Sequence, residues 1–252
     1  MITLASDFGT PYPAAMKGVI LRRCDARLVD VGHDFPRQDV RSAAFWLREV
    51  LPEFPPAVHL VVVDPGVGTG RAALVVRAGD HVLVGPDNGV LLPAARRLAD
   101  DDGVETYELE IGDPRSSTFH GRDVFAPGAA AVHEADLDRL PAVDGISPTG
   151  DVVDLAFPDP DLRTDGADGE VVVVDGFGNV VTNVPGAVLE DHETVRVNGE
   201  STPVVRSYAH AEAGTAVATV GSHGNVEFAV NQGRGDEAFG LAVGDGIELS
   251  FD

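Results

Sequence analysis

A segment with strand character, residues 59–64 (HLVVVD), runs directly into a glycine-rich turn that ends at Arg71. Its short, continuous run of β-branched and other apolar residues is typical of a parallel strand that is buried on both faces. In open α/β sheets, ligands bind in the crevice beyond the carboxyl ends of such strands. We therefore expect Asp64 and Arg71 to lie in a reactive loop.

Three other segments follow the same pattern, in which a strand ends in polar residues or glycine. They span residues 2–9, 27–34 and 81–89, and their ends carry Asp7, His33, Asp34, Asp87 and Asn88. Apolar residues at helical spacing predict helices between the strands, over residues 14–23, 40–50 and 91–99. Strands that alternate with helices indicate an α/β fold, with a largely parallel sheet flanked by helices.

The pattern changes after Val132. Residues 147–168 are dense in Pro, Asp and Gly, which is typical of a connection between domains. Beyond them, short strand-like segments without clear helices predict a small antiparallel barrel or sandwich. These segments span residues 170–175, 179–184, 194–197, 202–205, 216–220, 226–230 and 246–251. We therefore expect an α/β domain over residues 1–157, a linker over residues 158–168 and an antiparallel β domain over residues 169–252.

The formal net charge is −23, and Lys17 is the only lysine among 18 basic residues. Nucleic acid is therefore an unfavourable partner. The charge could attract a cationic ligand, but we favour a solvated surface adapted to a salty cytoplasm, where repulsion between carboxylates is screened over ~3 Å at about 1 M salt. This halophilic interpretation predicts that the chain loses its fold, as measured by circular dichroism, when salt is dialysed away.

No segment approaches the ~20 apolar residues that span a bilayer. The first nine residues have the pattern of a strand rather than that of a signal peptide. We therefore expect a cytoplasmic protein that does not bind membranes. The single cysteine, Cys24, is interpreted as a structural thiol rather than a nucleophile.

Two kinds of site are less favoured. The glycines at positions 66, 68 and 70 can form a backbone nest for an anion or only a tight turn, and the segment lacks the phosphate-loop and dinucleotide-binding patterns. No pair of potential metal ligands has the spacing of an HExxH or HxD motif, so we expect no metal. The ligand types of a two-metal hydrolase are nevertheless present at strand ends and in one loop, at Asp7, His33, Asp64, Asp87, Asn88 and His120.

Two loop segments combine groups that could act on or bind a substrate. In residues 117–127, His120 is either a catalyst or a surface or capping residue, whereas Arg122 and Asp123 are interpreted first as a structural ion pair. In residues 175–183, an amide and an aromatic ring could bind the edge and the face of a purine, although a β-turn is the simpler interpretation.

Taken together, six blocks of sequence resemble the S-adenosylmethionine (SAM) hydroxide adenosyltransferases, which are relatives of fluorinase and chlorinase. The blocks are DFG (7–9), MKGVI (16–20), DPGVGT (64–69), PDNG (86–89), TFHGRDVFAP (118–127) and FGNVVTN (177–183). They occur in order over nearly the whole chain. The resemblance implies an N-terminal α/β domain that binds SAM, a C-terminal antiparallel β-barrel, and a homotrimer with active sites between one subunit's N-terminal domain and its neighbour's C-terminal domain.

The resemblance also implies a reaction, the attack of water or hydroxide on the ribose 5′-carbon of SAM to give adenosine and methionine without a metal or cofactor. It assigns catalysis to Asp64, Arg71 and His120. The sulfonium is already a good leaving group, so such a site mainly has to position a partly desolvated oxygen nucleophile. Either His120 or Asp64 would accept the proton of water, while Arg71 would orient Asp64.

The remaining residues implied by the resemblance bind the substrate. Asp7 would contact the ribose hydroxyls, while the other residues would serve the adenine and methionine moieties; they are Asp175, Phe177, Asn179, Tyr208, Ser222, Asn231 and Gln232. Two positions depart from the family pattern. The loop after Gly9 is short, and His223 stands where the halogenating relatives have an arginine.

Two alternative functions remain open, a SAM-dependent halogenase and a non-catalytic sensor of SAM or adenosine. A halogenase should lack the full set of Asp64, Arg71 and His120, and fluorination usually accompanies a long insertion that is absent between Val76 and Val82. We therefore favour hydrolysis.

Overall fold

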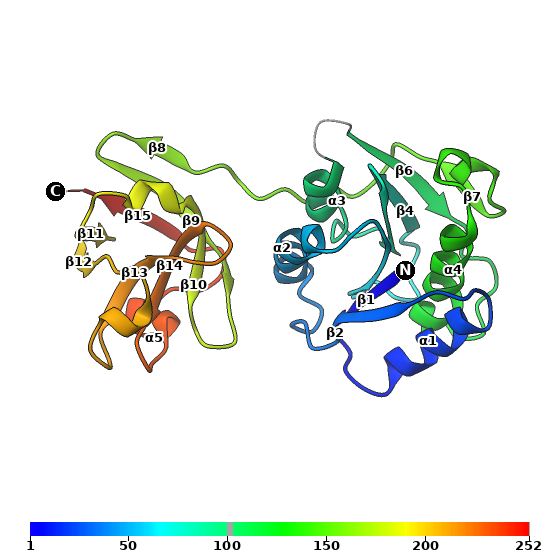
Figure 1. Ribbon diagram of the computed structural model, residues 1–252, viewed down its shortest axis with the longest axis horizontal. Coiled ribbons are helices and arrows are strands. Elements are labelled where there is room, and N and C mark those ends of the chain that lie inside the picture. Colours follow the sequence, from blue (N-terminus) through cyan, green and yellow to red (C-terminus); the bar gives the residue numbers. More distant parts are fainter. Residues whose placement is uncertain (100–102, 252) are drawn as a thin grey trace. The chain divides into compact units, whose positions relative to one another are not determined.

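The computed structural model describes residues 1–99 and 103–251. It divides the chain into two compact units, Met1–Ala156 and Phe157–Asp252. Figure 1 shows an N-terminal unit of strands and helices and a C-terminal unit made mainly of strands. None of the helices in the described ranges is long and apolar enough to span a membrane.

The N-terminal unit is built on a seven-stranded sheet in the order β2-β1-β3-β5-β4-β6-β7. Four adjacent strands, β2, β1, β3 and β5, run parallel, whereas β4 is antiparallel to both β5 and β6, and β7 is antiparallel to β6. The predicted largely parallel sheet is confirmed. The strands are β1 (Ile2–Ser6), β2 (Leu28–Gly32), β3 (Val58–Val62), β4 (Ala73–Ala78), β5 (His81–Pro86), β6 (Val104–Leu109) and β7 (Ile146–Pro148).

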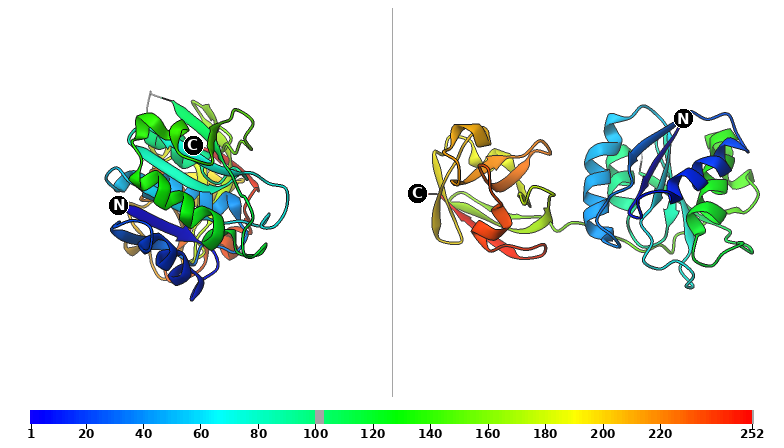
Figure 2. Two further views of the ribbon diagram at one scale, coloured as in Figure 1. Left: turned by 90° about the vertical axis from the view of Figure 1, so that its right-hand side faces the viewer. Right: turned by 90° about the horizontal axis from the view of Figure 1, so that it is seen from below.

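Helices cover both faces of this sheet (Figures 1 and 2). α2 (Val40–Val50) and α3 (Leu92–Ala99) pack together on one face, and α1 (Tyr12–Leu21) and α4 (Ala126–Glu134) pack together on the other. All three predicted helices are present, with ends displaced by two residues or fewer. α2 begins where the Asp39 side chain caps the backbone N–H of Ser42 at 2.9 Å. Shorter helical turns are η1 (Leu51–Glu53), η3 (Gly121–Phe125) and η4 (Leu137–Ala142).

The reversal of β4 brings the two ends of the glycine-rich turn together. β3 ends at Val62, and β4 starts at Ala73, whose partner in the antiparallel pair is Pro86 at the carboxyl end of β5. Asp64 and Arg71 therefore lie at the same edge of the sheet. The fully buried residues beneath this edge include Leu60, Val84 and Phe125.

The C-terminal unit contains one sheet in the order β12-β11-β15-β9-β10-β14-β13, with β8 paired to β9. All of its strand pairs are antiparallel, and a bridge from Val204 to Ala218 joins the two ends of this order, so the sheet nearly closes on itself. The predicted antiparallel barrel is confirmed. Its strands are β8 (Asp161–Arg163), β9 (Gly166–Val174), β10 (Val180–Pro185), β11 (Thr194–Val197), β12 (Glu200–Pro203), β13 (Ala216–Val220), β14 (Asn225–Val230) and β15 (Gly246–Ser250).

Two features of this unit differ from the sequence prediction. Part of the segment 158–168 is regular, because it contains β8 and the beginning of β9. Gly166 permits this pairing, since a Cβ atom at that position would lie 2.1 Å from the carbonyl oxygen of Leu249 in the neighbouring strand. A short helix, α5 (Gly235–Phe239), was not predicted; the other helical turns are η5 (Gly186–Leu189) and η6 (Tyr208–His210).

Candidate active site

Arg71 contacts both Asp64 and His120 in the N-terminal unit. Arg71 Nε donates to Asp64 Oδ1 at 2.9 Å, and Arg71 Nη2 donates to Asp64 Oδ2, so the guanidinium holds the carboxylate by two bonds. The same Nη2 lies 3.0 Å from His120 Nδ1. The side chains are largely buried, with 5% of Asp64 and 9% of Arg71 exposed, while His120 as a residue is 4% exposed.

The contact with Arg71 fixes the protonation of His120. A guanidinium has donors but no acceptor, so Nδ1 of His120 must accept and its proton must reside on Nε2. Burial, followed by the positive charge of Arg71, lowers the pKa of His120 below its usual value. His120 is therefore a neutral imidazole with an N–H donor on the nitrogen that does not face Arg71.

Close backbone packing brings the two loops of this cluster together. A Cβ atom at Gly68, where φ is +76°, would lie 2.6 Å from the carbonyl oxygen of Ser117, so only glycine fits. His120 itself precedes a π-helical turn, η3, which leads into α4. Such turns are frequent at functional sites because they redirect side chains within a helix.

A cavity of about 420 Å³ opens beside this cluster. Asp64 and His120 belong to its wall, as does Asp7 at the end of β1. Asp7 Oδ2 accepts the backbone N–H of Gln38 at 2.7 Å, which orients the carboxylate, while Oδ1 makes no hydrogen bond to a described residue. The cavity is large enough for a small organic molecule, for which pockets of about 300 to 1,000 Å³ are usual.

Three aromatic rings form one side of this cavity, and the sequence analysis did not single them out. Phe8, Tyr12 and Phe119 pack edge to face, with centroid separations of 5.9, 6.3 and 5.4 Å. Phe8 and Phe119 lie within the quoted blocks of sequence, and Tyr12 is the first residue of α1, just after the short loop that follows Gly9. Aromatic residues in loops that flank a proposed reactive segment were the available signal.

Arg122 and Asp123 form the ion pair that was the first interpretation of these residues. Arg122 Nε and Nη2 each donate to the Asp123 carboxylate at 2.7 Å, and this contact lowers the pKa of Asp123. Asp123 also accepts the backbone N–H of Ser116 at 3.0 Å. The pair thus anchors the loop before His120, and Arg122 additionally lies over the ring of Phe119 at 5.0 Å.

The other strand-end residues considered as metal ligands have structural partners. Asp87 accepts the backbone N–H of Val153 at 2.8 Å, and Asn88 donates to the carbonyl of Val63 at 2.9 Å. His33 lies within hydrogen-bonding distance of Ser6 and Asp30. Within the described parts of the chain, no three His, Cys, Asp or Glu side chains are arranged to hold a metal ion.

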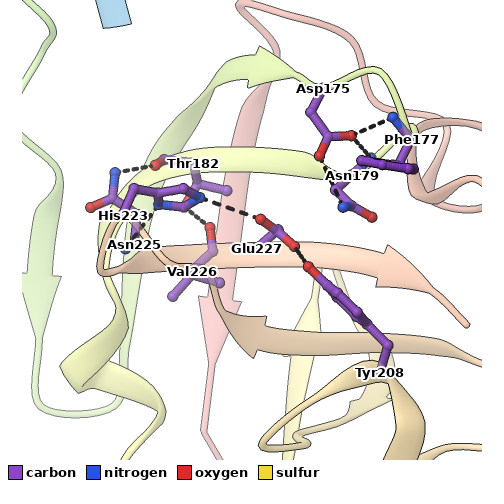
Figure 3. Close-up of polar contacts among 9 residues, drawn as sticks. All are labelled: Asp175, Phe177, Asn179, Thr182, Tyr208, His223, Asn225, Val226 and Glu227. Atoms are coloured by element: carbon purple, nitrogen blue, oxygen red, sulfur yellow. Dashed lines mark hydrogen bonds and ion pairs between the residues drawn. The ribbon is translucent and has the colours of Figure 1, made fainter. Parts of the chain in front are cut away.

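In the C-terminal unit, Asp175 organises a turn that presents Phe177 (Figure 3). Its Oδ1 accepts the backbone N–H groups of Phe177 and Asn179, both at 2.8 Å, and its Oδ2 accepts Asn179 Nδ2 at 3.0 Å. Gly178 provides the left-handed conformation, with φ of +86°. Phe177 is 80% exposed. The β-turn interpretation is therefore correct, and it coexists with an exposed aromatic face.

A buried carboxylate that sequence analysis missed links Tyr208 to His223 (Figure 3). The Tyr208 hydroxyl donates to Glu227 Oε1, and burial together with this contact raises the pKa of Tyr208. His223 Nδ1 accepts the backbone N–H of Asn225 at 3.2 Å, so Nε2 carries the proton and donates to Glu227 Oε2 at 3.3 Å. A charged residue in the otherwise apolar stretch 226–230 was the available signal.

The last three predicted substrate-binding residues lie close to the ends of β14. Ser222 belongs to the turn between β13 and β14, next to His223. Asn231 follows β14 and donates to the carbonyl of Ala211 at 2.8 Å. Gln232 adopts a positive φ of 59°. The predicted site residues thus form two groups, with Asp7, Asp64, Arg71 and His120 in the N-terminal unit and the others in the C-terminal unit.

Comparison with known proteins places these features in one family. The model of the SAM hydroxide adenosyltransferase N-terminal domain matches residues 2–140, and that of the C-terminal domain matches residues 169–248. A protein of Salinispora arenicola named (R)-S-adenosyl-L-methionine hydrolase is 41% identical over 99% of this chain and 97% of its own length. A protein of Thermus thermophilus with the same name is 42% identical over 97% of each chain.

Solved structures agree with this assignment. The crystal structure of an uncharacterized conserved protein from Thermotoga maritima superposes with a TM-score of 0.85, at 33% identity and with 100% of both chains covered. A conserved hypothetical protein from Thermus thermophilus gives a TM-score of 0.76, at 36% identity and with 98% of both chains covered. The chain therefore belongs to the SAM hydroxide adenosyltransferase family.

Proposed function

We propose that this protein hydrolyses SAM at the cavity of its N-terminal unit, giving adenosine and L-methionine. Membership of the family, and relatives named SAM hydrolases over nearly the whole chain, support the activity. One observation supports this location of the active site: Arg71 binds both Asp64 and His120 beside a cavity that is also lined by Asp7.

In the proposed reaction, a water oxygen forms a bond to the ribose 5′-carbon as the bond from that carbon to sulfur breaks. The bonding electrons move to the sulfonium, which leaves as the neutral thioether of methionine. Because His120 Nδ1 is occupied by Arg71, we assign the proton of water to Asp64, and the Nε2–H of His120 stabilises the developing hydroxide. Arg71 keeps the Asp64 carboxylate oriented through two hydrogen bonds.

Substrate binding is divided between the two groups of residues. Asp7 would accept hydrogen bonds from the ribose hydroxyls, for which Oδ1 is available. Phe177, Asn179 and Tyr208 would serve the adenine, and the remaining residues would serve the methionine moiety or border the base; these are Asp175, Ser222, Asn231 and Gln232. The 80% exposure of Phe177 within its own unit supports a role in contacting another molecule.

We also propose a cytoplasmic homotrimer in which the N-terminal unit of one subunit and the C-terminal unit of its neighbour form each site. Mixing an Asp64→Asn variant with an Asp175→Ala variant, after dissociation and reassembly, should then restore part of the activity. Activity returns because some interfaces then combine an intact N-terminal unit from one variant with an intact C-terminal unit from the other. Complete failure in mixtures that gel filtration shows to be reassembled would place the whole site within one chain.

The test of the function is product analysis after incubation with SAM in ¹⁸O-labelled water. Chromatography and mass spectrometry should find methionine, and adenosine with one ¹⁸O atom at the 5′ position. Chloride and bromide are included in parallel, because a 5′-halo-adenosine would indicate a halogenase. SAM binding without turnover would indicate a sensor. The relatives' name specifies the R epimer, so both sulfonium epimers are compared, and we expect faster hydrolysis of the R form.

A further inference from the structure

A second hollow, of about 470 Å³, lies on the N-terminal unit and is lined by four arginines. Arg22 and Arg23 come from the end of α1, and Arg115 and Arg122 come from the loop and turn around His120. Two carboxylates, Asp113 and Asp123, also line it. The local balance is therefore positive in a chain whose formal net charge is −23.

The carboxylates of the hollow do not neutralise all of its arginines. Asp123 is already bound by Arg122 through two bonds of 2.7 Å and by Arg115 at 3.4 Å. The side chains of Arg22 and Arg23 make no hydrogen bond or ion pair with any residue of the described ranges. These two exposed arginines, which follow α1, are thus free of protein partners among the described residues and can bind a ligand.

Each half of this cluster has a structural role of its own. Arg22 is the C-cap residue of α1, and a positive charge at that end of a helix interacts favourably with the helix dipole. Arg115 and Arg122, from a distant part of the sequence, bind Asp123, but neither role explains why the two pairs line the same hollow. A ligand that binds both pairs explains the convergence.

We propose that this hollow binds a small phosphate compound with at least two phosphoryl groups. Guanidinium groups match phosphoryl oxygens in bidentate geometry, and two arginine pairs offer donors for two such groups. The volume lies in the range of pockets for small organic molecules, about 300 to 1,000 Å³, and is larger than a single ion requires. Inorganic diphosphate and the diphosphate of a nucleotide share this chemistry.

The hollow and the SAM cavity have a common wall, which gives the proposed ligand a regulatory effect. Arg122 lines both, and its guanidinium lies 5.0 Å from the ring of Phe119 in the cavity. Asp123, in turn, holds the backbone of Ser116, another cavity residue. A ligand that draws Arg122 away from Asp123 therefore alters the SAM cavity. This coupling rests on the proposed function, whereas binding to the hollow does not.

The direct test is calorimetric titration of the full-length protein with inorganic diphosphate and with cytidine diphosphate, at constant ionic strength and the lowest salt that preserves the fold. Cytidine is chosen because its base is not adenine. Binding of both at similar affinity identifies the phosphoryl groups as the determinant, and tighter binding of cytidine diphosphate identifies a nucleotide. Both outcomes support the site, and binding of neither ligand to the wild type overturns it.

Matched variants distinguish binding of diphosphate at the hollow from nonspecific attraction of anions to the protein. Arg22→Gln combined with Arg23→Gln should weaken diphosphate binding by at least about tenfold, since two charge-assisted contacts are lost. Arg163→Gln combined with Arg206→Gln, which removes the same two charges from the C-terminal unit, should leave binding unchanged. Equal weakening in both variants overturns the proposal. If the Arg22→Gln, Arg23→Gln variant does not fold by circular dichroism, Arg115→Gln is tested in its place against the same criterion.

The regulatory effect has a separate measurement. Saturating diphosphate should change the KM for SAM in the wild type and leave it unchanged in the Arg22→Gln, Arg23→Gln variant, which retains the basal activity. Linkage requires SAM to shift the affinity for diphosphate by the same factor. Binding without a change in KM would overturn the coupling alone. Absence of SAM hydrolysis would overturn the proposed function and leave the calorimetric result intact.

Discussion

The two groups of site residues use a carboxylate in different ways. Asp64 binds the charged side chain of Arg71, is largely buried, and belongs to a cluster that is complete within the N-terminal unit. Asp175 binds backbone amides and holds a turn whose aromatic residue, Phe177, is exposed. The difference suggests a division of labour, in which one unit carries preorganised charges for the reaction and the other presents a surface for recognition.

Substitution of Asp64 gives the strongest test of this difference between the two groups of residues. We expect Asp64→Asn to lower kcat by roughly 10³-fold with little change in KM, because a group that acts on the nucleophile stabilises mainly the transition state. His120→Ala should behave in the same way. Steady-state kinetics with SAM measure both constants. Asp87→Asn is the control, because Asp87 lies at the same sheet edge and contacts Val153. A rise in KM as large as the fall in kcat would contradict the assigned role.

The opposite pattern is expected for the C-terminal turn. Phe177→Ala should raise the KM for SAM by about tenfold, since stacking of an aromatic side chain on a base contributes ~1–3 kcal/mol. The kcat should remain within about twofold of the wild-type value. Phe177→Tyr keeps the aromatic face and should restore the KM. If Phe177→Ala leaves KM unchanged in a folded protein, the exposed ring has no part in substrate binding.

A third test extends the comparison to the start of β3, at the other end of the strands, where the buried polar group is the neutral side chain of His59. His59 lies between Thr3 and His81, at 2.8 and 2.9 Å, and burial lowers its pKa to about 3. Below pH 6.5 the unfolded chain binds a proton at this position that the folded chain does not accept until about pH 3. The free energy of unfolding should therefore fall by up to ~1.4 kcal/mol per pH unit as the pH decreases through this range.

Denaturant titrations of the wild type and His59→Gln at pH 7, 6 and 5 isolate this contribution. Many carboxylates titrate in the same range, so the informative quantity is the difference between the two proteins. The wild type should lose stability more steeply than the variant. Parallel dependence on pH would show that His59 does not contribute to acid sensitivity.

The smallest expected effect concerns metal. If Asp64, Arg71 and His120 suffice for the reaction, dialysis against EDTA should leave kcat unchanged. Assays before and after dialysis, and again after adding Mg²⁺, Mn²⁺ or Zn²⁺, measure this. Loss of activity that a metal restores would revive the two-metal interpretation and give the carboxylates of the N-terminal unit a different role.

The sequence pattern predicted the family and the fold class, but it missed the strands β4, β6 and β7. Apolar periodicity located α2 to the residue, because its buried face recurs at helical spacing. It did not predict β4 or β6, and the antiparallel direction of β4 depends on its partner strands rather than on side-chain alternation. The strands near Gly166 were hidden because their composition resembles that of a turn.

The sequence predicted those site residues whose type and neighbours already indicate a function. It did not predict those that become informative only through contacts formed in the fold. A charged pair around a glycine-rich turn identified Asp64 and Arg71, and in the structure Arg71 binds both Asp64 and His120. Their catalytic roles remain predictions. Glu227 escaped notice because it becomes informative only when Tyr208 and His223 are brought to it by the barrel. Contacts between residues distant in sequence carry no local signal.

The reversed strand β4 also has a consequence for engineering. Since the segment between Asp64 and Arg71 leaves and re-enters the sheet at one edge, each end is anchored by its own strand. Gly68 is packed against a neighbouring carbonyl, but a side chain at Gly70 would meet no atom within 4 Å. Gly70 is therefore the position in this turn at which a side chain could be introduced, directly beside the arginine that contacts Asp64 and His120.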